Sequence, residues 1–266
     1  MKVTGNLFKM GSRLADPVDY TIIIGGDEIP ASELIGKNIR IEFMDKINCI
    51  ACGRETKTSF FQGYCYPCFT TLPQTDTCIM QPETCRAHEG ISRDMEWSKH
   101  HCLVDHIVYL ALTSSVKVGV TRESQVPTRW IDQGAWKVIK LARTPNRYLA
   151  GVMETGLKSI YTDKTSWQKM LKDEKNEYYD LLDEKERAWE GISTDMQEYF
   201  IEDDEITEIN YPVLKYPPKV KSVNFDRLNS VEGALTGVRG QYFIFDNNQV
   251  FNVRRHNGYL VNLITL

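Results

Sequence analysis

The chain has 266 residues, 42% of them hydrophobic, which is enough for about two domains with apolar cores. No apolar run approaches the roughly 20 residues of a membrane-spanning helix, and the first residues lack an apolar stretch of signal-peptide length, so a soluble, cytoplasmic protein is expected. The net charge of −4 is unevenly distributed: residues 173–208 carry 15 acidic and 3 basic side chains, which leaves a net charge of +8 elsewhere. That positive charge favours a polyanionic partner.

Residues 1–48 are predicted to form an N-terminal β segment. Two apolar runs, Tyr20–Ile24 and Ile39–Phe43, have the length and composition of short strands. Glycine-containing turns bound these runs at residues 25–26 and 36–38, as expected where the chain reverses direction.

Residues 49–103 form a predicted zinc-binding module that contains the most informative motif of the chain. Two C-x2-C pairs are formed by Cys49, Cys52, Cys65 and Cys68. Four thiolates at this spacing can surround one tetrahedral zinc ion, and no ligand position is then left for a catalytic water. We therefore predict a structural zinc ribbon. Two disulfides are the alternative, but seven cysteines cannot all pair within one chain and a reducing compartment is expected.

Three further cysteines in the same module suggest a second metal site. Cys78, Cys85 and Cys102 remain once the ribbon is filled, and His88 is one of four histidines close to them in the sequence. Three thiolates and one imidazole would complete a Cys3His zinc site. The alternative is that these thiols are small buried core side chains, because their spacings are irregular.

Residues 104–164 alternate between strand and helix periodicity. The predicted strands are 107–112, 116–121 and 136–142. One helix is predicted to open at Pro127 and another at Thr144-Pro145, where Thr144 can cap the helix and Pro145 suits its first position. The predicted order is therefore β-β-α-β-α.

Residues 165–208 are predicted to form a long acidic helical segment. Apolar side chains recur every three or four residues from Trp167 to Phe200, and Thr165 or Ser166 can cap the start. We expect the aromatic side chains of this stripe to face a core and the acidic face to be solvated.

Residues 209–266 return to strand patterns and form a predicted basic β module, with seven basic and three acidic residues. Residues 241–245 and 250–253 flank a turn and predict a hairpin, and residues 259–263 predict a further strand. Exposed aromatic side chains on such a module could stack on nucleobases. The alternative is that these aromatic residues only form its core.

The region from 104 to 164 resembles the GIY-YIG nuclease superfamily. The resemblance is carried by Ile107–Tyr109, Lys117–Thr121, Arg129 and Glu154 on the predicted β-β-α-β-α order. It implies that Tyr109 acts on the attacking water, Arg129 holds the scissile phosphate and Glu154 binds one divalent cation. Two positions depart from the family pattern, since Lys117 replaces the second tyrosine and Gln133 stands where many members have His or Tyr. The lysine form looks like that of some phage-type branches.

The chain as a whole also resembles an uncharacterised bacterial domain-of-unknown-function family. The segments that carry this resemblance are Cys49-x2-Cys52-Gly53-Arg54, Lys117–Arg122, Pro127–Ala135 and Gly240–Tyr242. The resemblance extends over nearly the full length and implies no activity, because the family has none assigned.

These resemblances predict an α+β architecture: a GIY-YIG-like domain with a zinc-ribbon insert, flanked by β-rich terminal parts and the acidic helical segment. Phosphodiester cleavage needs a base, a cation beside the phosphate and usually a carboxylate-bound Mg²⁺ or Mn²⁺. Tyr109, Lys117, Arg129 and Glu154 supply these groups. The first hypothesis is therefore a metal-dependent endonuclease acting on DNA or RNA.

Two alternatives to the endonuclease remain. In the first, Lys117 forms a salt bridge with Glu154, and the chain is a non-catalytic factor that binds DNA or RNA or associates with ribonucleoprotein. In the second, the zinc-stabilised chain is a scaffold that binds other proteins through its acidic segment.

Overall fold

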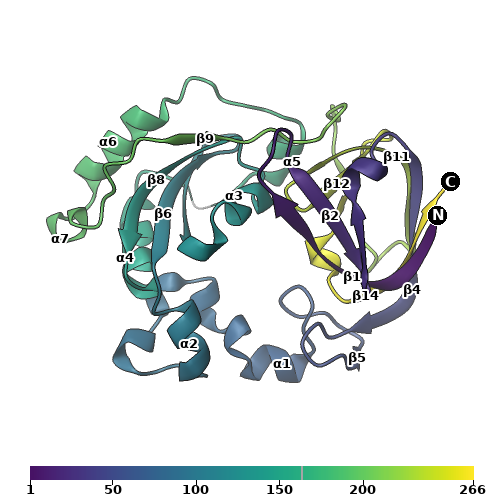
Figure 1. The fold of residues 1–266 in the computed structure, drawn as a ribbon, viewed down its shortest axis with the longest axis horizontal. Coiled ribbons are helices and arrows are strands. Elements are labelled where there is room, and N and C mark those ends of the chain that lie inside the picture. Colours follow the sequence, from purple (N-terminus) through teal and green to yellow (C-terminus); the bar gives the residue numbers. More distant parts are fainter. Residues whose placement is uncertain (163) are drawn as a thin grey trace. The chain divides into compact units, whose positions relative to one another are not determined.

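The computed structural model describes residues 1–162 and 164–266 and divides the chain into two compact units (Figure 1). The first unit comprises Met1–Thr70, Leu171–Asp173 and Ile209–Leu266, and the second comprises Thr71–Met170 and Glu174–Glu208. Helices and sheets are mixed, and the predicted α+β class is confirmed. Within the described ranges, no helix is long and apolar enough to cross a membrane.

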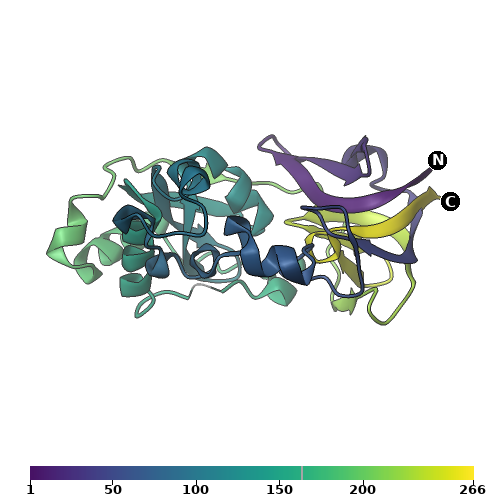
Figure 2. The ribbon, with the colours of Figure 1, turned by 90° about the horizontal axis from the view of Figure 1, so that it is seen from below.

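The first unit is built on a ten-stranded sheet in the order β10-β13-β12-β11-β4-β14-β1-β2-β3, with β5 paired to β4. Its strands are β1 Lys2–Arg13, β2 Asp19–Ile24, β3 Asp27–Pro30, β4 Asn38–Asn48, β5 Glu55–Thr56, β10 Lys221–Val223, β11 Ser230–Arg239, β12 Tyr242–Phe245, β13 Gln249–Asn252 and β14 Tyr259–Thr265. β1 pairs antiparallel with β14, so the two ends of the chain lie side by side (Figures 1 and 2).

The strands predicted from apolar runs are confirmed in this unit. β2 and β4 contain the two N-terminal runs, and β12 and β13 form the predicted hairpin with Phe243 opposite Phe251. β1 lies within the predicted N-terminal β segment but, like β11, was not identified as a separate strand, and glycines interrupt the apolar pattern of both. In β1, a Cβ atom on Gly5 would lie 2.8 Å from the backbone nitrogen of Gly25, so this glycine permits the close approach of β1 to the turn after β2.

The second unit contains a four-stranded sheet in the order β7-β6-β8-β9. Its strands are β6 His106–Leu112, β7 Val116–Arg122, β8 Lys137–Thr144 and β9 Ile206–Glu208. The α-helices in the described residues are α1 Tyr66–Thr71, α2 Met95–His101, α3 Thr128–Asp132, α4 Arg147–Leu157, α5 Trp167–Leu171, α6 Leu181–Gly191 and α7 Thr194–Gln197. The β-β-α-β-α order predicted for this region is confirmed by β6, β7, α3, β8 and α4.

The two faces of β6 have different neighbours, because successive side chains of a strand point to opposite faces. Val108 and Leu110 join a buried cluster that also contains Met153 of α4 and Ala188 of α6. Tyr109 points to the other face, where its ring lies 5.9 Å from that of Trp130 in α3. α3 therefore sits over the face that carries the candidate site.

The predicted cap of α4 is wrong. Thr144 ends β8 and is fully buried, and α4 begins two residues beyond Pro145, at Arg147. The side chain of Asn146 caps the helix by accepting a hydrogen bond of 3.0 Å from the backbone nitrogen of Leu149. Asparagine is among the preferred capping residues, so the cap has the expected chemistry at a different residue.

The predicted long acidic helix is also wrong, because the structure has three short helices, α5, α6 and α7, followed by β9. Asp173, just after α5, has a left-handed backbone with φ of 56°. Side-chain oxygens of Asn176 and Asp180 then accept backbone hydrogen bonds from Tyr178 and Leu182, which competes with helix continuation. The aromatic stripe does not face the core throughout, since Tyr178 is 100% and Trp189 44% exposed.

Candidate functional site

The first four cysteines converge at one point of the first unit. Cys49 and Cys52 follow β4, and Cys65 and Cys68 lie at the start of α1. Their sulfur atoms all lie within 4.8 Å of one another, and those of Cys52 and Cys65 are 3.8 Å apart. Thiolates at Zn–S distances of about 2.3 Å in a tetrahedron have this separation, so the group could hold zinc.

The backbone around Cys49 forms a tight turn and favours the ionised form of its thiol. The nitrogen of Gly53 donates to the carbonyl of Cys49 at 2.8 Å, and Gly53 has a left-handed φ of 71°. Burial opposes ionisation of Cys49, but hydrogen bonds from the backbone of Cys65, Cys52 and Ala51 lower its pKa to about 6. A thiol with such a pKa is readily deprotonated, which is the form that binds metal.

The remaining three cysteines converge in the second unit. The sulfur atoms of Cys78, Cys85 and Cys102 lie within 4.8 Å of one another, and all three side chains are buried. Short 3-10 turns at Thr77–Ile79 and Pro82–Thr84 place the first two, and the third follows the end of α2. This cluster could therefore also hold zinc.

His88, the predicted fourth ligand of this cluster, lies outside it in the structure. The described residues whose ligand atoms meet there are the three cysteines alone. The imidazole of His88 instead stacks on Tyr148 with ring centroids 4.4 Å apart, and its Nε2 lies 3.7 Å from the carboxylate of Glu89.

Arg147, at the start of α4, supports the three-cysteine cluster. Its guanidinium donates to the backbone carbonyls of Cys78 at 3.4 Å and of His101 at 3.0 Å. Hydrogen bonds from Cys78 and Cys85, with the charge of Arg147, lower the pKa of Cys102. A buried positive charge at this position stabilises negative charge on sulfur.

A third candidate site surrounds Tyr109. The hydroxyl of Tyr109 donates a hydrogen bond of 3.0 Å to the side-chain oxygen of Gln133, which follows α3. Burial raises the pKa of Tyr109 to about 12, while the nearby charge of Arg129 lowers it and that of Glu154 raises it. The hydrogen bond joins β6 to the end of α3, and the charges of Arg129 in α3 and Glu154 in α4 act on the same hydroxyl.

Gly119 of β7 makes room for this tyrosine. It pairs directly with Tyr109 in the sheet, and a Cβ atom on Gly119 would lie 2.7 Å from the Tyr109 hydroxyl oxygen. Any larger residue would displace the ring. The Lys117–Thr121 motif therefore includes a glycine with a local steric role.

Lys117 and Glu154 are both buried side chains of the second unit. Lys117 is only 4% exposed, and its Nζ donates to the Thr165 hydroxyl at 3.4 Å. Glu154 is 9% exposed, and its carboxylate lies 3.8 Å from the Nζ of Lys158 one turn along α4. Gln133 was noted in the sequence only as a departure from a family pattern, whereas it is the direct partner of the Tyr109 hydroxyl.

Comparison with known proteins gives one match. A family model described as a protein of unknown function (DUF2797) matches residues 36–261, which is most of the chain. No curated protein and no solved structure matches. The predicted resemblance to an uncharacterised family is confirmed, and the match brings no activity or metal with it.

Proposed function

We propose that this chain, which belongs to the family of proteins of unknown function DUF2797, is a zinc-holding protein that binds DNA or RNA through the Tyr109 site. The observation that carries the proposal is the hydrogen bond from Tyr109 to Gln133, with the charges of Arg129 and Glu154 acting on the same hydroxyl, within the β6-β7-α3-β8-α4 arrangement. That order of elements and residues resembles the GIY-YIG type. In this arrangement Arg129 binds a backbone phosphate, for which its planar guanidinium is suited.

The charge distribution supports a nucleic-acid partner. The excess of acidic residues is confined to residues 173–208, and the rest of the chain has a net charge of +8. Phosphate contacts from arginine and lysine supply most of the affinity of non-specific nucleic-acid binding. Each of the two cysteine clusters would stabilise its own unit by holding zinc.

Two properties of Tyr109 favour binding over catalysis. Its side chain is fully buried and its pKa is raised to about 12, whereas an efficient general base has a pKa near the working pH. Its hydroxyl already donates a hydrogen bond to Gln133. Under this proposal the Tyr109 hydroxyl holds Gln133 in place, and Arg129 contacts the ligand.

Metal-dependent cleavage of a phosphodiester is the second candidate function. It is favoured by Glu154, a largely buried carboxylate close enough to Tyr109 to raise its pKa. Such a carboxylate can bind one Mg²⁺ or Mn²⁺, which would stabilise the charge that develops on phosphate. Arg129 would then hold the scissile phosphate, and Lys117 would assist.

A gel-shift assay with DNA and RNA at low salt, run beside a nicking assay with Mg²⁺ and Mn²⁺, tests both functions. Replacing Arg129 by Ala should weaken binding about tenfold, because a charge-assisted hydrogen bond contributes about 1.5 kcal/mol. Arg187→Ala is the matched control, since Arg187 lies on the acidic helix α6 and pairs with Glu184. It should leave binding unchanged.

The outcomes separate the two candidates. Binding that depends on Arg129 without any cleavage supports the first function. Cleavage that Glu154→Gln abolishes while binding persists supports the second, because this change removes a cation ligand and keeps the positive charges. Absence of binding to both DNA and RNA at low salt rejects both functions.

A further inference from the structure

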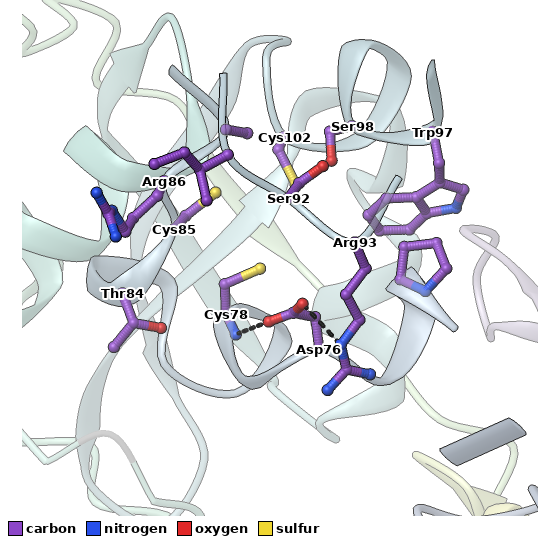
Figure 3. Close-up of a pocket in the computed structure, with 13 residues that line it drawn as sticks. Asp76, Cys78, Thr84, Cys85, Arg86, Ser92, Arg93, Trp97, Ser98 and Cys102 are labelled. Carbon is purple, nitrogen blue, oxygen red and sulfur yellow. Dashed lines mark hydrogen bonds and ion pairs between the residues drawn. The ribbon is translucent and has the colours of Figure 1, made fainter. Parts of the chain in front are cut away.

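A cavity of about 340 Å³ in the second unit opens directly onto the three-cysteine cluster (Figure 3). All three thiols, those of Cys78, Cys85 and Cys102, line it. The other walls are mixed: Ile91 and Trp97 are apolar, Thr84, Ser92 and Ser98 carry hydroxyl groups, and Asp76, Arg86 and Arg93 are charged. This volume lies within the range of small-molecule sites.

The two cysteine clusters differ in the number of ligands that they offer. The cluster in the first unit provides four thiols, which fill a tetrahedral zinc ion. The cluster in the second unit provides three, counting the residues that the structure describes. A zinc ion with three protein ligands completes its coordination with a water or another small molecule, as in catalytic sites.

Asp76 and His101, two side chains close to this cluster in the chain, make other contacts. The carboxylate of Asp76 accepts from the backbone nitrogen of Cys78 and forms a 3.0 Å ion pair with Arg93. The ring of His101 stacks on Trp97 at 3.9 Å, and its Nδ1 lies 2.8 Å from the carbonyl oxygen of Trp97. With His88 stacked on Tyr148, the cavity is the direction from which a fourth ligand can approach.

We propose that a zinc ion held by Cys78, Cys85 and Cys102 takes its fourth ligand from the cavity, and that this ligand is the sulfur of a small thiol. The proposal concerns a different site from Tyr109 and does not depend on nucleic-acid binding. On binding, the thiol loses its proton to solvent, a zinc–sulfur bond forms and the coordinated water leaves. The bound thiolate is held ionised at neutral pH and is therefore nucleophilic.

Sulfur is the ligand that this site favours for two reasons. Soft thiolate ligands match the metal that three cysteines select. A fourth thiolate also brings the charge of the zinc and its ligands to −2, and the nearby Arg147 guanidinium offsets one of these two negative charges. The apolar side chains of Ile91 and Trp97 can then cover the carbon part of the thiol.

Cobalt substitution in the full-length protein tests the proposal, because Co²⁺ takes the place of zinc and its absorption reports bound sulfur. The purified chain should hold two metal ions. Adding 2-mercaptoethanol should raise the sulfur-to-cobalt charge-transfer absorption by about one-seventh. The seven cysteine thiolates of the chain stay bound, and the added thiol supplies an eighth. Ethylene glycol, which carries a hydroxyl in place of the thiol, should leave the spectrum unchanged.

Two variants make the assignment specific. Cys85→Ser should reduce the metal content to one ion and remove the response, while the four-cysteine cluster is already filled and stays silent. His88→Ala should keep both ions and respond as the wild type does. Four outcomes would each overturn the proposal. Two concern the wild-type chain: it holds a single metal ion, or its spectrum is unaffected by the thiol. The other two are an equal response to ethylene glycol and a response found only in His88→Ala.

Discussion

Tyr109 illustrates what the sequence can predict about one residue and what it cannot. Its place on a strand before a second strand follows from local periodicity, which β6 and β7 confirm. Its hydrogen bond to Gln133 depends on how α3 lies over the sheet, a contact between residues 24 positions apart. Local patterns contain no signal for such a contact, so Gln133 was noted only as a departure from a family pattern.

Gly119→Ala should destabilise the second unit by about 1 to 3 kcal/mol, the usual cost of overfilling a packed site. The added Cβ would lie 2.7 Å from both the Cζ atom and the hydroxyl oxygen of Tyr109, whose buried ring has little room to move. Urea unfolding of the two proteins measures the change. Gly26→Ala is the control, because nothing lies within 4 Å of its Cβ position, and equal stability of both variants would contradict the placement of Tyr109.

His256 should make the first unit less stable as the pH falls from about 6.5 to 4. Burial lowers its pKa to about 4, and the ring is neutral because its Nε2 accepts from the backbone nitrogen of Phe225 at 3.2 Å. Between about pH 6.5 and pH 4 the unfolded chain binds a proton at this histidine and the folded chain does not. The free energy of unfolding therefore falls on acidification, by up to about 3 kcal/mol.

The comparison with His256→Gln isolates this effect from loss of zinc in acid, because both proteins keep the same cysteines. The stability advantage of the wild type over the variant should shrink between pH 7 and pH 5. Asp226 and Arg255, the charged groups that act on the ring, are present in both proteins. An advantage that is constant or grows on acidification would show that His256 is charged in the folded chain.

At the scale of elements, motifs with a fixed spacing were predicted better than periodic segments. The spacing of two C-x2-C pairs determines which sulfur atoms can meet, and the structure brings those four together. The acidic segment had a helical period, but capping side chains at Asn176 and Asp180 and the left-handed Asp173 divide it. Periodicity reports a buried face and carries little information about where a helix ends.

Cys52→Ser should remove one zinc ion per chain and loosen residues 49–70. If the four thiols bind zinc, metal binding would supply folding free energy to this small module. Elemental analysis of protein purified without chelator measures the metal, and hydrogen exchange measures the loosening. Unchanged zinc content in the variant would show that these four cysteines do not form a metal site.

Gly151→Ala should separate α4 from the turn Pro82–Thr84 and so disturb the three-cysteine cluster. A Cβ atom on Gly151 would lie 2.1 Å from the backbone nitrogen of Glu83, and backbone cannot yield as a flexible side chain can. We expect a loss of at least about 2 kcal/mol in unfolding free energy and weaker retention of the second metal ion.

Gly156→Ala is a matched control on the same helix, since its Cβ would meet only the Cδ1 end of Ile192 at 3.2 Å. Alanine is the better helix former, so this variant should be close to neutral. If both variants keep their stability and metal, α4 does not support the cluster in the way the structure indicates.

At the scale of the whole molecule, the first unit is assembled from both ends of the chain. β4 lies between β11 and β14, and β14 also pairs with β1, so the sheet joins residues more than 200 positions apart. Local patterns predicted several of these strands one by one, but strand pairing is a long-range property. For the same reason the sequence suggested a series of consecutive modules, whereas the second unit is inserted into the first.

Nucleic-acid binding, if it uses the positive charge outside residues 173–208, should weaken steeply with salt. Each phosphate contact releases counterions, so the logarithm of the affinity should fall linearly with the logarithm of the salt concentration. Replacing Arg129 by Ala should reduce the slope by about 0.7 on single strands or 0.9 on duplex DNA, because one phosphate contact is lost.

Titrations at several salt concentrations provide the slopes, with Arg187→Ala as the control. An affinity that is independent of salt, or a slope that Arg129→Ala leaves unchanged, would remove Arg129 from the phosphate contacts.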